Sequence, residues 1–249
     1  EKIMFLIQCI LVSMVHVLSI LDGRILGQNL LNTPIVEATL VGLICGDVQT
    51  GLVMGATLQL IFMGFVGIGV TSLPNSSAGT ILAVAFAIMS NLTPDSAIAL
   101  SMPIALLFQP CGIIPRIINN VWNPKCDAAA ERGDFKAIER YYWLGVVIFA
   151  IVYFVPMFLA LYFGSGAVET IINFIPEVVM NGLTKASSVL PALGIALLMN
   201  YIMDKDATPF IFLGFILAAF LGVNSLGVAG LGAVIAVVYY NMVQRKANE

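Results

Sequence analysis

The sequence predicts an all-α protein that crosses a membrane several times. Apolar side chains make up 60% of its 249 residues and charged side chains 10%, and the mean hydropathy is +1.00. An ordinary soluble domain carries about 25% charged residues. Long apolar runs separated by short polar breaks predict about seven to nine membrane segments, some of them broken or re-entrant. We expect a single membrane domain over residues 1–249.

The same composition argues against other classes of protein. The net charge is −3 and no basic stripe is present, so nucleic acid is not an expected partner. The four cysteines are scattered and form no CxxC pair, so neither a zinc-ligand spacing nor a disulfide framework is expected: Cys9, Cys45, Cys111 and Cys126. We predict no metal and no cofactor.

Residues 3–21 are long enough for one helical span. They end near Asp22 without a small-residue cleavage site, so we expect a retained span and not a signal peptide. Gln8 and Asp22 are fourteen residues apart, about four helical turns, which places both on one face of the helix. The one histidine, His16, has no neighbouring group that would tune its basicity, so a packed, hydrogen-bonded role is favoured over a catalytic one.

Residues 34–75 are apolar but carry seven glycines and several polar side chains, among them Glu37, Thr57 and Gln59. The glycines at 42, 46, 51 and 55 keep the spacing that lets helices approach closely in lipid. We interpret the segment as an interrupted or re-entrant pair of short helices that forms part of a polar site. The alternative is a tightly packed helix pair with a turn at Gly46 and Asp47, where Asp47 acts as a cap.

The central region predicts two more apolar segments and then one hydrophilic stretch. Residues 78–90 are apolar, and residues 96–115 contain three prolines that predict a kink or an early end. Residues 116–140 hold five of the eleven Lys and Arg residues, so the positive-inside rule predicts a cytoplasmic loop. A solvated amphipathic helix is the expected form, and the same surface is also suited to a soluble partner.

The C-terminal half starts with a span over residues 141–163. Aromatic residues at the start of this span are expected to anchor it at the membrane interface. Residues 173–204 form a second broken segment, in which Glu177, Asn181 and Lys185 are spaced by four on one helical face. These three residues are either a structural group or a gate. Residues 207–222 and 226–243 complete the spans. A broken segment in each half is a pointer to a transporter's binding site.

Three strings resemble one known family. TLVGLICGDVQTGLVMGATLQ, IPEVVMNGL and FLGFILAAF are similar to the membrane IIC subunit of the mannose-type sugar permeases of the phosphoenolpyruvate-dependent phosphotransferase system. The resemblance runs over nearly the full chain, including KCDAAAERGDF in the hydrophilic stretch. Glucose- and mannose-handling members have glutamate where Gln59 stands here, and a small or apolar residue at Glu37. The spacing from Gln8 to Asp22 and the glycine-containing loop before Pro34 look closer to the amino-sugar and sorbose branch.

The resemblance implies a multi-pass protein of the bacterial inner membrane that moves a hexose or amino sugar. It implies a IID membrane subunit as partner, with three IIC–IID pairs in the assembly. It also implies soluble IIB and IIA proteins whose histidines carry the phosphoryl group. No phosphoryl-accepting residue is expected in this chain, although the complex as a whole is a sugar phosphotransferase.

A hexose site needs carboxylates and amides that meet a ring of hydroxyls. The residues that supply this mixture are Gln8, Asp22, Glu37, Thr57 and Gln59. Each of them alone is equally compatible with helix–helix hydrogen bonding. Two other functions stay open at this point. One is a secondary transporter or channel that moves its substrate unmodified, and the other is an assembly subunit whose IID partner holds the sugar.

Overall fold

The computed structural model describes residues 2–65, 73–90, 92–174, 177–203 and 208–247. Every regular element in these ranges is helical, and the all-α fold class is confirmed. The chain divides into two compact units, residues 1–198 and residues 199–249, which are described separately below. The single membrane domain expected over the whole chain stays a prediction.

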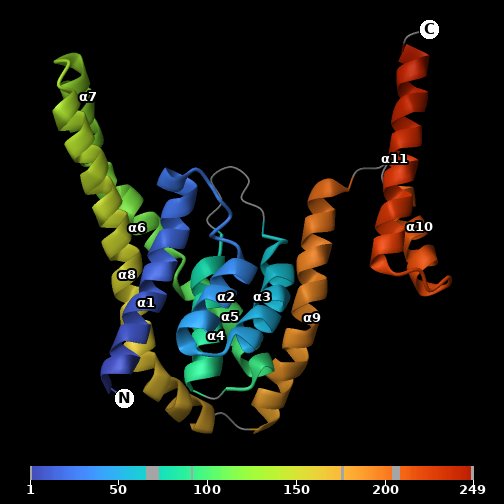
Figure 1. Cartoon of the computed structure of the whole chain (residues 1–249), viewed down its shortest axis with the longest axis horizontal. Coiled ribbons are helices and arrows are strands. Elements are labelled where there is room, and N and C mark those ends of the chain that lie inside the picture. Colours follow the sequence, from blue (N-terminus) through green and yellow to red (C-terminus); the bar gives the residue numbers. More distant parts are fainter. Residues whose placement is uncertain (1, 66–72, 91, 175–176, 204–207, 248–249) are drawn as a thin grey trace. The chain divides into compact units, whose positions relative to one another are not determined.

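Figure 1 shows the helices in chain order. They are α1 (Lys2–Leu21), a π-helical turn η1 (Asp22–Leu26), α2 (Pro34–Cys45), α3 (Val48–Phe62), α4 (Ser76–Met89), α5 (Pro94–Leu107), α6 (Pro110–Asn119), α7 (Asn123–Glu131), α8 (Phe135–Phe174), α9 (Glu177–Ile202), α10 (Thr208–Ala219) and α11 (Ser225–Ala247).

Four helical stretches in the described residues are long and apolar enough to cross a membrane: Lys2–Leu26, Pro94–Glu131, Phe135–Gly164 and Ser225–Met242. Several shorter apolar helices accompany them. Helix α2 has 12 residues and α3 has 15, so at 1.5 Å per residue they reach about 18 and 22 Å. Neither spans a hydrocarbon core of about 30 Å alone.

Helices α2 and α3 form a hairpin whose turn is built by Gly46 and Asp47. Gly46 adopts φ +94°, a left-handed conformation that favours glycine, and its N–H donates to the Gly42 carbonyl at 2.9 Å. Asp47 then caps α3, because its carboxylate accepts from the Thr50 N–H at 3.0 Å and from the Thr50 hydroxyl at 2.6 Å. The predicted capping role of Asp47 is confirmed.

The glycine spacing marks where the two helices touch. A Cβ atom added to Gly51 would lie 2.6 Å from the Ala38 carbonyl oxygen and 2.9 Å from the Gly42 Cα. Only a hydrogen fits there, so the backbones approach closely and gain dispersion contacts along their length.

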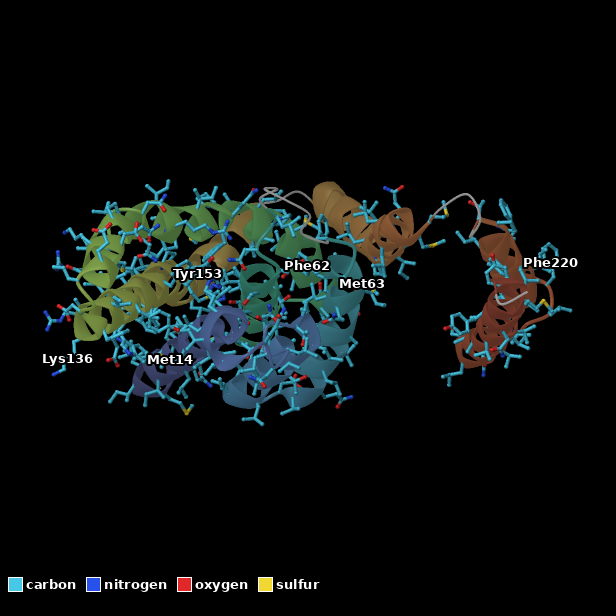
Figure 2. The ribbon with its side chains drawn as sticks, turned by 90° about the horizontal axis from the view of Figure 1, so that it is seen from above. Met14, Phe62, Met63, Lys136, Tyr153 and Phe220 are labelled. Atoms are coloured by element: carbon cyan, nitrogen blue, oxygen red, sulfur yellow. The ribbon has the colours of Figure 1, made fainter. Side chains whose placement is uncertain are left out.

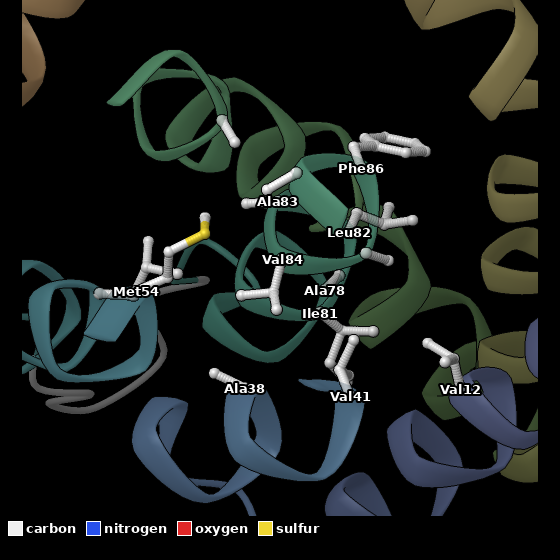
Figure 3. Close-up of a cluster of buried hydrophobic side chains, with 14 of the residues drawn as sticks. Val12, Ala38, Val41, Met54, Ala78, Ile81, Leu82, Ala83, Val84 and Phe86 are labelled. Atoms are coloured by element: carbon white, nitrogen blue, oxygen red, sulfur yellow. The ribbon is translucent and has the colours of Figure 1, made fainter. Parts of the chain in front are cut away.

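Helix α4 is the centre of the first unit. Its residues from Ser77 to Ala87 are all buried, and most of them are small. Figure 3 shows α4 side chains packed towards Val12 of α1, Val41 of α2 and Met54 of α3. Helix α8 runs beside α1 and also contacts α4. Small side chains on α4 let these helices come close, which brings their polar residues within hydrogen-bonding reach.

The hydrophilic stretch 116–140 is largely helical. It comprises the end of α6, all of α7 and the start of α8. Trp122 stacks on Tyr141 with ring centroids 6.0 Å apart, so α7 folds back against α8. Asp134 caps α8 by accepting from the Ala137 N–H at 3.1 Å. The helical form expected here is observed, divided among three helices, while its amphipathic character and its side of the membrane stay predictions.

The second unit contains α10 and α11. Asn224 caps α11 by accepting from the Gly227 N–H at 2.8 Å. Helix α10 has no buried residue, and its large apolar side chains are exposed. Such a surface is suited to lipid or to another apolar partner.

Candidate functional site

A cluster of buried polar side chains lies where α1, α2 and α4 meet. The Ser19 hydroxyl of α1 donates to Oε1 of Glu37 on α2. His16 Nδ1 lies 2.9 Å from the Ser77 hydroxyl of α4, and the hydroxyl oxygens of Ser19 and Ser77 lie 3.5 Å apart. Glu37 and His16 have no exposed surface at all. We call these four residues the polar cluster.

The polar cluster leaves hydrogen-bonding capacity unused. His16 Nε2 and Glu37 Oε2 are buried and have no hydrogen-bond partner among the described residues. Leaving a buried polar atom unpaired costs about 1–3 kcal/mol. Such groups mark functional positions more often than ordinary core positions, since packing alone gains nothing from them.

His16 is packed as well as hydrogen-bonded. Its ring meets the ring of Tyr153 on α8 edge-on at 5.5 Å and that of Phe108 at 6.4 Å. A histidine enclosed in this way cannot reach a soluble phosphoryl donor. The packed role predicted for His16 is confirmed.

Asp22 organises the loop that leads into α2. One carboxylate oxygen accepts from the Asn29 N–H at 2.9 Å and the other from the Leu31 N–H at 3.1 Å. The loop contains Gln28 at φ 62° and Leu30 at φ 64°, which non-glycine residues rarely adopt. Strained backbone of this kind gathers at functional sites, where the surrounding contacts hold it.

Gln59 of α3 also contacts the start of α2. Its Oε1 accepts from the Ile35 N–H at 3.4 Å, which satisfies one of the unpaired donors of the first turn. This hydrogen bond is long and therefore weak. Thr57, two residues before Gln59, donates to the Val53 carbonyl of its own helix at 3.2 Å.

The structure separates the five expected site residues along α2. Three of them are placed near its N-terminal end by separate contacts: Asp22 bonds the loop before α2, Glu37 lies in the first part of α2, and Gln59 contacts Ile35. Gln8 instead donates to the Ile44 carbonyl at 3.3 Å, near the other end. The α2 residues that contact Gln59 and Gln8 are nine apart, or about 13 Å along the helix. Residues 173–204 hold the remaining candidates.

Glu177, Asn181 and Lys185 all belong to α9. The side chains of Glu177 and Asn181 lie outside the described residues, and that of Lys185 is exposed. The choice between a structural group and a gate stays a prediction.

Sequence reasoning missed Ser19 and Ser77. A signal for Ser19 was present, because Ser13, His16, Ser19 and Asp22 follow one another at intervals of three on an otherwise apolar helix, and all four are buried. Residues three apart are neighbours on a helix surface. Ser77 gave no such signal, since it stands at the polar start of α4 like any first-turn serine.

Polytopic membrane transporters characteristically contain short broken helices packed around buried polar side chains, and this chain has both features. Comparison with known proteins gives the family. The family model described as "PTS system sorbose-specific iic component" matches residues 6–238. The chain belongs to this family, and it is a IIC membrane subunit of phosphotransferase-system sugar transport, as the sequence resemblance indicated.

Individual relatives agree with this assignment. The chain is 32% identical over 221 residues to the "PTS system mannose-specific EIIC component" of Escherichia coli strain K12, covering 88% of this chain and 83% of that protein. It is 32% identical over 205 residues to "N-acetylgalactosamine permease IIC component 1" of the same strain, covering 82% of this chain and 77% of that protein.

Two solved structures share the fold. One is titled "Structure of membrane protein", with a TM-score of 0.84 and 31% identity over 94% of this chain and 95% of that one. The other is a complex of the mannose transporter ManYZ with microcin E492, with a TM-score of 0.58 and 30% identity over 97% and 96% of the two chains.

Proposed function

We propose that this IIC subunit carries a hexose or amino sugar across the bacterial inner membrane, and that a soluble IIB protein phosphorylates the sugar. A IIA protein would supply the phosphoryl group to IIB. The observation that carries the proposal is the group of polar side chains around the N-terminal end of α2. It combines Asp22, Glu37 and Gln59 with strained backbone. That mixture of carboxylates and an amide is what sugar hydroxyls require.

A IID subunit is the proposed membrane partner, in an assembly of three IIC–IID pairs. One similar structure is of a mannose transporter, ManYZ. The exposed apolar side chains of α10 and α11 supply a surface that such a subunit would cover.

The proposed site includes all five residues, with different availability to a sugar. Gln59 holds its partner by one long hydrogen bond, so a sugar hydroxyl can replace that bond at little cost. Asp22 is fixed by several shorter ones, so its contribution is to hold the loop in place. Glu37 has one oxygen without a partner, but the side chain is fully buried, so a sugar hydroxyl would reach it only after the surrounding helices move apart. Gln8 and Thr57 complete the proposed set, with Gln8 near the other end of α2.

A second candidate has one observation in its favour. Asp22 and Glu37 are fully buried and are bonded to the chain's own donors. If they remain so during transport, they serve assembly, and the IID partner holds the sugar. A secondary transporter is not favoured, since the family is that of the phosphotransferase system.

The test is uptake and phosphorylation of labelled hexoses and hexosamines in cells that express this chain with its IID and IIB partners. We expect accumulation of sugar phosphate for at least one sugar of the panel, and none without IIB. Accumulation of free sugar against a gradient in the absence of IIB would contradict the proposal. Sugar binding by IID alone, with unchanged affinity when this chain is added, would favour the second candidate.

A further inference from the structure

A cavity of about 360 Å³ lies at the corner formed by the end of α1, the α6–α7 junction and the first half of α8. It is separate from the polar cluster. Its walls include Leu21 and Arg24 from the first helix, Asn119 and Trp122 from the junction, and Gly145 and Phe149 from α8. Most of the remaining lining is apolar or aromatic.

The charges at this cavity are positive. Arg24 is the one charged side chain among the described residues that line the cavity. Its guanidinium carbon lies 4.6 Å from the centre of the Phe149 ring. The Lys125 ammonium is not part of the lining, but it lies 4.5 Å from the centre of the ring of Trp122, which is. One lining cation, Arg24, with no carboxylate among the described lining residues favours an anionic ligand.

Two polar atoms of the wall have no partner among the described residues. They are Trp122 Nε1, which can only donate, and Asn119 Oδ1, which accepts. A ligand that satisfies both atoms must carry an acceptor and a hydroxyl-type donor close together. A phosphate group bearing a polyol supplies that pair.

The apolar remainder of the wall decides between a free phosphate ester and a lipid. A small phosphorylated sugar would leave this surface uncovered, whereas an acyl chain would cover it. The neighbouring Tyr141, Tyr142 and Trp143 have the composition of the aromatic belt that lies at lipid headgroup depth. Basic pockets between membrane helices are known to take such headgroups.

We propose that this corner cavity binds one anionic phospholipid with a hydroxyl-bearing headgroup. The phosphate lies beside Arg24 and the Trp122 N–H, the headgroup hydroxyl donates to Asn119, and an acyl chain covers the apolar wall. Because Trp122 Nε1 and Asn119 Oδ1 are buried, binding requires both side chains to turn these atoms towards the cavity. The bound lipid would tie α1 to α6, α7 and α8.

The chain has two tryptophans, so Trp143→Phe leaves Trp122 as the one indole reporter. The experiment reconstitutes this variant in vesicles containing increasing fractions of brominated phosphatidylglycerol or brominated phosphatidylcholine and records fluorescence quenching. We expect that half-maximal quenching needs a several-fold lower fraction of brominated phosphatidylglycerol than of brominated phosphatidylcholine. Arg24→Gln should raise that fraction about fivefold, since one basic residue near a membrane surface contributes about that factor.

Gly145→Leu is an independent second variant. A Cβ at this position meets only Asn119, at 3.4 Å, so the larger side chain fills the cavity without removing a charge. We expect it to weaken selective quenching as Arg24→Gln does.

Lys136→Gln is the matched control, because Lys136 is an exposed cation that does not line the cavity, and it should leave quenching unchanged. Figure 2 shows Lys136 at the edge of the unit, well away from Tyr153.

Three outcomes would overturn the proposal. The first is equal quenching by the two lipids. The second is unchanged selectivity in both Arg24→Gln and Gly145→Leu, with circular dichroism showing that both variants remain folded. The third is loss of quenching on addition of inorganic phosphate or a hexose phosphate, which would assign the cavity to a soluble phosphate ester.

Discussion

At the scale of single residues, Glu37 is an ionisable side chain enclosed in the core of the first unit. Its carboxyl group has no exposed surface, and its described partner on α1 is the Ser19 hydroxyl. An isolated charge at such a position is costly, so hydrogen bonding to neighbouring hydroxyls is what makes the position tolerable. The shape of the group and its accepting oxygen therefore matter more to folding than its charge.

Glu37→Gln should be well tolerated for stability, because the amide oxygen still accepts from Ser19. Glu37→Ala should destabilise the folded chain by about 2–4 kcal/mol, since it leaves a cavity and an unpaired hydroxyl. Thermal unfolding in detergent measures both variants. Equal melting temperatures for Glu37→Ala and the parent protein would show that the polar cluster contributes nothing to folding. Loss of uptake in Glu37→Gln with normal stability would support the proposed place of Glu37 in the sugar site.

His16→Gln should retain phosphorylating uptake, because the enclosed imidazole has no route to a phosphoryl donor. The glutamine amide can still pair with Ser77, although the ring contact with Tyr153 is lost, worth about 0.5–1.5 kcal/mol. The assay is sugar phosphorylation by membranes that contain the complex. Abolished phosphorylation with normal expression and assembly would make His16 part of the reaction.

Gln59→Glu should change which sugar is preferred. The glutamine amide offers a donor and an acceptor, while glutamate offers acceptors only. A buried sugar hydroxyl that loses its partner costs about 1–3 kcal/mol, or roughly 5- to 150-fold in affinity. The resemblance at this position predicts a shift towards mannose or glucose. Competition by a sugar panel measures it, and unchanged selectivity would remove Gln59 from the specificity-determining residues.

At the scale of elements, the α2–α3 hairpin shows what local pattern can and cannot predict. The glycine spacing predicted close helix contact, and the Gly46 and Asp47 pair predicted the turn, because both depend on neighbouring residues alone. The partnership of Ser19, Glu37 and Ser77 was not predictable, since it depends on how α1, α2 and α4 pack. The same limit explains why Gln8 was grouped with residues that lie at the other end of α2.

Gly51→Val should destabilise the hairpin more than any exposed substitution. Its Cβ would meet the Ala38 carbonyl oxygen at 2.6 Å, so the two helices must separate. Overpacking of this kind costs about 1–3 kcal/mol, and occasionally more. Gly182→Ala is the matched control, because a Cβ there has nothing within 4 Å. Thermal unfolding of both variants checks the prediction, and a Gly51→Val protein as stable as the control would refute close packing at this point.

At the scale of the whole molecule, sugar transport by phosphorylation requires that one particular end of the membrane domain face the phosphoryl donor. The basic residues of the α6–α8 region predict which end this is, because positively charged segments remain in the cytoplasm. The compact folding of α7 against α8 through Trp122 and Tyr141 presents this end as a structured surface. A soluble IIB protein would meet helices here and not a flexible loop.

A cysteine at Lys136 should therefore react with an impermeant thiol reagent in inverted vesicles and not in intact cells. Lys136 is exposed at the start of α8, so the reagent can reach it once it is on the correct side. The background must have Cys9, Cys45, Cys111 and Cys126 replaced, since all four are free thiols. Labelling after the intact cells are permeabilised serves as the control for reactivity. Labelling in intact cells would reverse the topology, and the IIB protein would then have to meet the opposite end of the domain.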